Sequence, residues 1–350
     1  MIVCPGNSQH IGSRSSQQDA FGFSDKDDLA FVVHGGVLAV VADGMGGMAN
    51  GGEASHSAVR AFLRAYMAKQ ADEAVLAAML RALNEANQAV ITLAQQVGEE
   101  NVGTTLVAAV IHSDALHWVS AGDSRLYLWR SGQLTQLSED HTYASDLDRD
   151  AANGSISPEE AENHPERRSL TSYLGLTPLE LVDYNPEPFQ VFAGDRLLLC
   201  SDGLYAALEE IEIAPIFDRE AQQTAEDLVA LVLAKDRQNQ DNLTVAILAC
   251  ESDSVLAMNH TREIPPTNRY LGWLVGAAMV GLAVAGVAFW YLFIAPTPTP
   301  TPAPASPAAS AVPRAAAVTA SNLFVVSGVV FENGWRVGGC EFIHTGNGYA

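Results

Sequence analysis

Two neighbouring stretches of the chain repeat apolar residues with the period of an amphipathic helix. In the first stretch the apolar face consists of Val59, Phe62, Leu63 and Tyr66. In the second stretch the corresponding face consists of Leu76, Leu80, Leu83, Asn87 and Val90. We therefore expect two adjacent helices that each turn one face toward a core, and a further helix around residues 223–236.

Short apolar runs between turn residues predict strands for most of the remaining chain up to residue 250. Residues 104–130 predict three strands joined by tight turns, and residues 195–203 and 242–250 each predict one more. Residues 30–44, AFVVHGGVLAVVADG, predict a hairpin that turns at Gly35–Gly36. Because hairpins outnumber strand–helix–strand units, we expect an α+β fold of mostly antiparallel sheets with helices packed outside them.

Residues 271–294, LGWLVGAAMVGLAVAGVAFWYLFI, break this pattern with 24 residues that carry no charge. As a helix this stretch would be roughly 36 Å long, which is enough for a tilted crossing of a bilayer. Trp273 and Trp290 lie near its ends, where interfacial aromatic residues are common. A buried core helix would not need so long an apolar run. We therefore predict a single membrane-spanning helix.

The charges on either side of this stretch predict its orientation. Arg262 and Arg269 precede it, whereas the next basic residue after it is Arg314. Positively charged flanks stay on the cytoplasmic side, so the residues before the span are expected in the cytoplasm and the tail after it outside.

The composition divides the chain into five segments. The folded region comprises residues 1–251, followed by a juxtamembrane linker at 252–270 and the span at 271–294. A Pro/Ala-rich linker at 295–321 then leads to a short tail at 322–350. Two β-rich runs in the tail predict a hairpin that turns at Asn333–Gly334.

The formal net charge of the chain is −22, and residues 1–250 contain 15 Lys and Arg against 36 Asp and Glu. Such a surface repels phosphate backbones, and we therefore expect no nucleic acid among the partners. Cys200 and Cys250 lie inside apolar runs, which predicts buried free thiols.

Several aspartates lie at the end of a predicted strand or in a turn beside one. They are Asp19, Asp43, Asp123, Asp202 and Asp241. Each alone is typical of a turn, and Asp43–Gly44 is itself a common turn signal. Together, strand ends can meet at one end of a sandwich, where clustered carboxylates repel one another unless cations neutralise them. Oxygen ligands without His or Cys favour Mg²⁺ or Mn²⁺, so a metal site is predicted, with turn residues as the alternative.

A set of motifs occurs in the order and approximate spacing of the metal-dependent protein phosphatase 2C family. They are RSSQQDA, VVADGMGG, GTT, AGDSRLYLWR, LSEDHT, LTSYLG, LLLCSDGL and DNLTVAIL. Residues 8–250 therefore resemble the bacterial serine/threonine phosphatases of that family. The resemblance implies an αββα sandwich, in which two antiparallel sheets are flanked by helices and metals lie in a cleft at one end.

The resemblance also implies a function for residues 1–251, namely metal-dependent hydrolysis of phosphoserine and phosphothreonine on proteins. The implied partners are phosphorylated proteins, in particular a serine/threonine kinase and its substrates. Combined with the predicted span, the resemblance places the chain in the bacterial inner membrane, with the catalytic domain in the cytoplasm.

Site roles follow from the same resemblance, position by position. Asp43 would bridge two catalytic ions, Mn²⁺ or Mg²⁺, and Gly44 would offer its carbonyl to one of them. The carboxylate set would be completed, directly or through waters, by Asp19, Asp202 and Asp241. Asp123 matches the position that, with Asp202, holds a third and weaker ion in bacterial members.

Arg14 matches the arginine that grips the substrate phosphate, for which a bidentate guanidinium is well suited. A hydroxide bridging the two ions would attack phosphorus in line, without a phosphoenzyme. Met45 stands where eukaryotic relatives often carry a histidine proposed as the general acid, so the identity of that acid is open. Gln18 replaces the Glu or Asn of many relatives, and His141 is expected to have a structural role.

Residues 143–169 match the variable flap of the family and are expected to be polar and irregular, with a short helical start at Ser157–Pro158. Arg167 and Arg168 in this segment are interpreted either as contacts for acidic substrates or as part of a solvated charged loop. The alternative to an active phosphatase is a catalytically weak, membrane-anchored sensor that binds phosphoproteins. The complete set of aspartates argues against that alternative.

Overall fold

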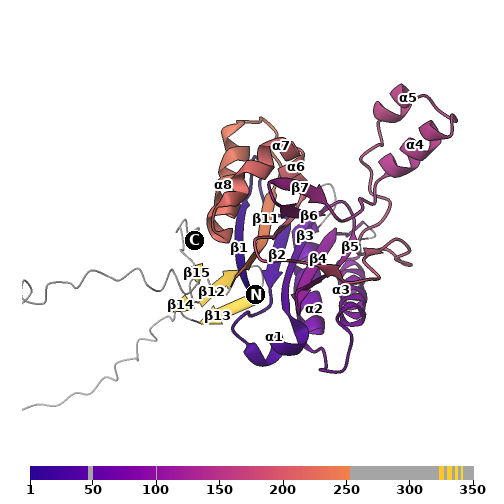
Figure 1. Ribbon diagram of the computed structural model, residues 1–350. Helices are drawn as coiled ribbons and strands as arrows, with labels where there is room; N and C mark the ends of the chain where they lie inside the picture. The colour runs from indigo at the N-terminus through magenta and orange to yellow at the C-terminus, as the bar shows by residue number, and fades with distance from the viewer. Residues whose placement is uncertain are drawn as a thin grey trace, which may run out of the picture. The chain divides into compact units, whose positions relative to one another are not determined.

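The computed structural model describes residues 1–45, 50–99 and 101–252, together with four short strands near the C-terminus (Figure 1). The predicted span at 271–294 and most of the two flanking linkers lie outside the described residues. Within the described part of the chain, no helix is both long and apolar enough to cross a bilayer.

Two antiparallel sheets form the centre of the folded region. The first sheet contains, in spatial order, β1 (Ile2–His10), β11 (Leu243–Glu251), β10 (Arg196–Cys200), β6 (Arg125–Arg130) and β7 (Gln133–Gln136). The second contains β2 (Asp19–Phe23), β3 (Val37–Asp43), β4 (Leu106–His112), β5 (Ala115–Ala121) and β8 (Asp183–Tyr184), with β9 (Phe189–Gln190) also paired to β5. The buried side chains of one cluster come from strands of both sheets, so the sheets pack face to face.

Helices cover the outer face of each sheet (Figure 1). The second sheet is covered by α2 (Gly51–Met67) and α3 (Val75–Val97). The first sheet is covered by α6 (Asp202–Tyr205), α7 (Glu210–Ile213), the 3₁₀ helix η1 (Ala214–Asp218) and α8 (Ala221–Ala234). The result is the αββα sandwich that the resemblance implied.

Burial on both faces explains the sequence of the central strands. In β4 the residues from Leu106 to Ile111 are all buried, because the inner face meets the other sheet and the outer face meets a helix. The predicted apolar face of α2 is confirmed, since Phe62 and Tyr66 are fully buried against the second sheet. Burying each such side chain stabilises the fold by about 1.5–3 kcal/mol. Cys200 and Cys250 are buried free thiols, as predicted.

The predicted hairpin at Gly35–Gly36 is wrong. Leu29–Gly35 forms the helix α1, whose first turn is capped by the side chain of Asp28 accepting from the backbone N–H of Phe31 at 3.1 Å. The ring of Phe31 packs edge-on against Tyr66 at 5.9 Å, and this tertiary contact distinguishes a short helix from a strand of similar composition. Strand β3 pairs with β2 instead.

The segment predicted to be an irregular flap contains two short helices, α4 (Tyr143–Ala152) and α5 (Pro158–Glu162), which project from the sandwich (Figure 1). The helical start at Ser157–Pro158 is confirmed by a capping box between Ser157 and Glu160. In the tail, β12 (Leu323–Val326) pairs with β13 (Val329–Glu332), and β14 (Arg336–Val337) pairs with β15 (Cys340–Glu341). The turn expected at Asn333–Gly334 therefore falls between the two pairs.

Candidate metal centre and active site

Asp19 and Asp43 face each other across two neighbouring strands. Asp19 is the first residue of β2 and Asp43 the last of β3, and their Cα atoms are direct partners in the antiparallel ladder. Side chains directly opposite each other in such a ladder lie on the same face of the sheet and interact. Two charged carboxylates in this position repel each other. Two aspartates with only a turn-forming role would have no need to lie opposite each other.

The other aspartates come mainly from the first sheet. Asp202 begins α6 directly after β10, and Asp241 stands two residues before β11, which is the neighbour of β10. Asp123 lies in the turn that leads from β5 in the second sheet to β6 in the first. Strand ends of both sheets therefore bring the five predicted residues together, as their mutual electrostatic effects show.

Burial and mutual repulsion raise the pKa values of this cluster. Burial, followed by the charges of Asp19, Asp202, Asp123 and Asp241, raises the pKa of Asp43 well above its usual value. Burial is also the main cause that raises the pKa of Asp19 to about 6. The pKa values of Asp202 and Asp123 rise to about 6 as well, each through burial and then a neighbouring aspartate. Divalent cations would remove this repulsion.

Asp19 has one oxygen held by the protein and one oxygen without a partner. It is only 1% exposed, and its Oδ2 accepts hydrogen bonds from Ser201 Oγ at 2.7 Å and Thr244 Oγ1 at 2.8 Å. Its Oδ1 is buried and forms no hydrogen bond. An unsatisfied buried carboxylate oxygen is costly, and a bound cation would satisfy it.

Asp43 is held in place by hydrogen bonds that its backbone groups form with two threonines. Its carbonyl accepts from the backbone N–H of Thr105 at 2.9 Å and from Thr104 Oγ1 at 2.8 Å, while its N–H donates to Thr105 Oγ1 at 2.9 Å. These threonines belong to the GTT motif, for which the sequence alone predicted no role. Their hydrogen bonds hold the backbone of Asp43 and do not use its carboxylate.

Gly44 occupies a position where there is no room for a side chain. Its N–H donates to the carbonyl of Gln18 at 3.0 Å. A Cβ atom at Gly44 would lie 2.1 Å from the carbonyl oxygen of Gly51 and 2.6 Å from that of Gln18. Glycine therefore allows the start of α2 to approach the end of β3 at the site.

Arg14 and Asp241 form an ion pair, with 2.6 Å between Arg14 Nη2 and Asp241 Oδ2. Both side chains are partly exposed. The next residue, Asn242, holds the segment that carries Arg14, since its Nδ2 donates to the carbonyls of Ile11 at 2.8 Å and Ser16 at 3.1 Å. Sequence reasoning missed Asn242, although it is part of the quoted motif DNLTVAIL.

Two residues hold the turn that carries Asp123. His141 accepts from the backbone N–H of Gly122 through Nδ1 at 3.1 Å and donates its own N–H to the Gly122 carbonyl at 3.0 Å, which is the structural role expected. Burial lowers the pKa of His141. The Tyr205 hydroxyl donates to Asp123 Oδ2 at 3.1 Å, and the Arg125 guanidinium stacks on the Tyr205 ring at 3.6 Å. Tyr205 was not recognised from the sequence.

The donor set fits hard divalent cations. It consists of carboxylate oxygens, one of them unpaired and buried, and such ligands suit Mg²⁺ and Mn²⁺. In the part of the chain that the structure describes, no three His, Cys, Asp or Glu side chains already stand in the arrangement of a metal site. In the structure Arg14 contacts one oxygen of Asp241, and two hydroxyls contact one oxygen of Asp19.

Among the described residues, the flap, residues 143–169, is held by contacts within itself and not by contacts with the carboxylate cluster. Arg167 forms two hydrogen bonds with the carboxylate of Asp148, at 2.8 and 3.1 Å, which link the end of the segment to α4. Arg168 is exposed. The interpretation of Arg167 as a substrate contact is therefore less well supported than the interpretation as part of a charged, solvated segment.

Comparison with known protein families covers four of the five aspartates of this cluster, since the family match ends before Asp241. A family model described as protein phosphatase 2C matches residues 7–236. The serine/threonine phosphatase stp of Listeria welshimeri is 34% identical over 230 residues, which cover 65% of this chain and 86% of that protein.

Solved structures show the same similarity in three dimensions. The crystal structure of the serine/threonine phosphatase PstP/Ppp of Mycobacterium tuberculosis has a TM-score of 0.59 at 30% sequence identity, over 72% of this chain and 100% of that chain. The catalytic domain of PstP in complex with two manganese ions has a TM-score of 0.56 at 29% identity, over 72% and 99%. Sequence and fold are thus shared throughout the sandwich.

Proposed function

The chain belongs to the protein phosphatase 2C family, and we propose on this basis that residues 1–251 hydrolyse phosphoserine and phosphothreonine on proteins with the help of Mn²⁺ or Mg²⁺. The observation that carries this proposal is the position of Asp43. Burial and four neighbouring carboxylates raise its pKa well above the usual value, and its backbone hydrogen bonds to Thr104 and Thr105 do not use its carboxylate.

The carboxylates would hold the ions. Asp43 would be shared between two of them, and Gly44 would contribute its carbonyl to one. The remaining ligands, directly or through waters, would be Asp19, Asp202 and Asp241, with Asp123 and Asp202 at a third and weaker site. Ions bound by such residues lower the pKa of water and thus supply hydroxide near neutral pH for in-line attack on phosphorus.

The protein residues around the ions orient the reacting groups. Ser201 and Thr244 fix the carboxylate of Asp19 through its Oδ2, so that Oδ1 is the oxygen available to a cation. Arg14 would turn from Asp241 to the substrate phosphate and bind two of its oxygens, which stabilises the charge on the transferring group. Met45 carries no proton to donate, so the leaving oxygen would take its proton from water.

Location and partners are part of the same proposal. The segment 271–294 would anchor the chain in the bacterial inner membrane, with residues 1–251 in the cytoplasm and the tail outside. The substrates would be proteins phosphorylated by a serine/threonine kinase, and that kinase itself. Support for the membrane anchor comes from the uncharged sequence of this segment and from the arginines before it.

Phosphate release from a phosphothreonine peptide, measured on the full chain during a Mn²⁺ titration, tests the proposal. We expect turnover that requires the metal and that falls at least about a hundredfold in Asp43→Asn, because one substitution removes a ligand of two ions. Mn²⁺ binding without release from any of several phosphopeptides would instead support the membrane-anchored sensor. Absence of metal binding would contradict both functions.

A further inference from the structure

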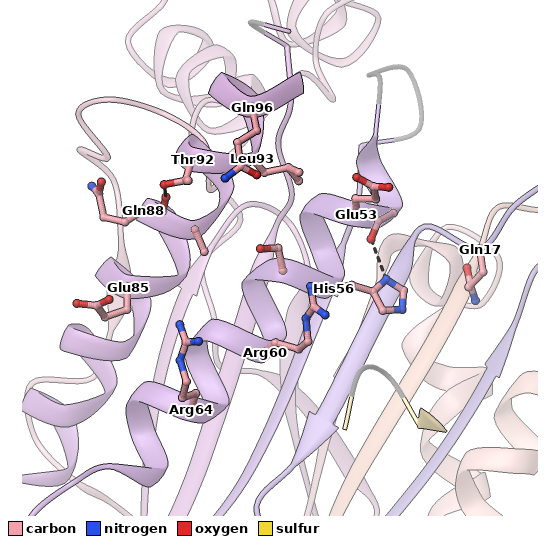
Figure 2. Close-up of a pocket in the computed structure, with 13 residues that line it drawn as sticks. Gln17, Glu53, His56, Arg60, Arg64, Glu85, Gln88, Thr92, Leu93 and Gln96 are labelled. Carbon is pink, nitrogen blue, oxygen red and sulfur yellow. Dashed lines mark hydrogen bonds between the residues drawn. The ribbon is translucent and has the colours of Figure 1, made fainter. Parts of the chain in front are cut away.

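A groove with a volume of about 890 Å³ lies between α2 and α3. Figure 2 shows the side chains of α2 on one side of it and those of α3 on the other. The residues that matter here are Gln17 at one end, His56, Arg60 and Arg64 from α2, and Gln88 and Thr92 from α3. The opposite faces of both helices pack on the second sheet, so the groove is on the outside of the sandwich.

Two arginines in this groove have no acidic partner. Arg60 and Arg64 are exposed and stand one helical turn apart on the same face of α2. Among the described residues, neither arginine forms an ion pair or a hydrogen bond, whereas most other arginines there do. In a chain with 41 acidic and 19 basic residues, two arginines that form no ion pair with the described residues are available to an anionic ligand.

The groove also contains negative charge at defined places. Glu53 and Glu85 line it together with the arginines. His56 adds a third basic side chain to the row, and its Nδ1 bonds to the carbonyl of Gly52 at 2.7 Å. A negative charge on a ligand would therefore be favoured beside Arg60 and Arg64 and opposed beside the glutamates.

One end of the groove adjoins the carboxylate cluster. Gln17 and Gly52 line that end. Their chain neighbours Gln18 and Gly51 are the two residues whose backbones touch Gly44. The groove end at Gln17 and Gly52 therefore lies next to the backbone segments that contact Gly44.

We propose that the groove binds an acidic segment of the substrate phosphoprotein, whose carboxylates lie on Arg60 and Arg64. This inference rests on the proposed phosphatase function and names the class of substrate. The helical rise places the two arginines about 12 and 18 Å along α2 from Gly52. An extended peptide advances about 3.3 Å per residue, so the acidic residues lie at least about four to six positions from the phosphoresidue, which lies beyond Gly52.

Peptide binding to the full chain in EDTA tests this without turnover. The probes are two fluorescent phosphothreonine peptides, which carry either glutamates or glutamines about four to six positions from the phosphothreonine, placed on each side in turn. We expect the wild-type chain to bind the glutamate peptide about three- to tenfold more tightly at low salt, as two exposed charge pairs allow. The double variant Arg60→Gln/Arg64→Gln should lose this preference.

A matched control neutralises two exposed cations elsewhere. Arg219→Gln/Lys235→Gln removes the same charge from surface ion pairs outside the groove and should keep the wild-type preference. Equal binding of both peptides by the wild type, or a preference that survives in Arg60→Gln/Arg64→Gln, would overturn the proposal. So would a dimer by light scattering that the same variant dissociates, because a second copy would then be the occupant.

Phosphate release from the same peptides with Mn²⁺ separates this inference from the proposed function. Support for both is a glutamate-peptide preference in binding and in kcat/KM that disappears in the groove variant. A preference in binding without hydrolysis of either peptide would contradict the phosphatase function and still support the acidic ligand of the groove.

Discussion

Arg14 and Asp241, to which the family resemblance assigns different ligands, hold each other in an ion pair of 2.6 Å. The arginine is expected to bind phosphate and the aspartate to bind a cation. In the structure, Arg14 contacts the carboxylate that would bind the cation, and Asp241 contacts the guanidinium that would bind the phosphate. A metal bound through Oδ2 of Asp241 and a phosphate bound by Arg14 would each compete with this pair, so each event should make the other easier.

Replacing Arg14 should separate these two effects. In Arg14→Ala, Asp241 is free, and the affinity for Mn²⁺ measured by calorimetry should increase by up to about fivefold, as an exposed ion pair permits. The KM for a phosphothreonine peptide should increase at least about tenfold, because a charge-assisted contact to phosphate is lost. Arg14→Lys is the control and should show smaller changes in both. Weaker Mn²⁺ binding in Arg14→Ala would contradict the competition inferred here.

The stability of the metal-free protein should increase as the pH falls from 7 to 5. The folded-state pKa of Asp19 is about 6, against 3.8 for an ordinary aspartate. Between these values the folded state binds more protons than the unfolded state, so stability falls as pH rises through this window. The change for one such buried group is on the order of 2 kcal/mol.

Thermal unfolding of the full chain in EDTA, followed at several pH values, measures this change. Saturating Mn²⁺ should remove the effect or reverse its sign, because ions stabilise the charged carboxylates and protons compete with them. A metal-free melting temperature that is constant or rises between pH 5 and 7 would show that burial does not raise the pKa of Asp19.

Gly44→Ala should damage both fold and site. The added Cβ would lie 2.1 Å from the carbonyl oxygen of Gly51, and both partners are backbone that a rotamer change cannot move. We expect a loss of stability of about 2–3 kcal/mol and loss of Mn²⁺-dependent turnover. Gly52→Ala is the matched control, since its Cβ would come no closer than 3.1 Å to the Gln17 carbonyl. Equal melting temperatures for the two variants would contradict this account.

Asn242→Ala should act on substrate binding through the segment that carries Arg14. The substitution removes hydrogen bonds to Ile11 and Ser16, and leaves the Gln18 N–H without its acceptor at 2.7 Å. We expect a stability loss of about 1–3 kcal/mol, and a rise in KM that exceeds the fall in kcat. Asn163→Ala, which removes one exposed hydrogen bond in the flap, serves as the control. A fall in kcat alone would point to a different role.

Sequence patterns predicted the features that depend only on the residues of a single segment. The buried faces of α2 and α3 follow from residues on one helix, and each site aspartate is recognisable where its own strand ends. The helix α1 was not recognisable, because its apolar residues also fit a strand and the contact of Phe31 with Tyr66 decides between them.

The residues that support the site could not be predicted from the sequence, because their roles also depend on contacts between distant segments. Ser201 acts on Asp19 across 182 positions and Thr244 across 225 positions, so neither sequence context reveals the partner. Arg60 and Arg64 resemble any solvated helix face until α3 is placed beside them to form a groove. The chemical type of each site residue could be predicted from the sequence, whereas the residue that it contacts could be identified only from the fold.

The carboxylates belong to two sheets rather than to one. Asp19 and Asp43 are fixed to the second sheet, and Asp202 and Asp241 stand at strands of the first. The distances among them therefore depend on how far the sheets slide over the apolar layer that separates them. That layer sets the spacing between the two pairs of carboxylates. Substitutions deep within it are expected to change the affinity for Mn²⁺ as well as the stability of the fold.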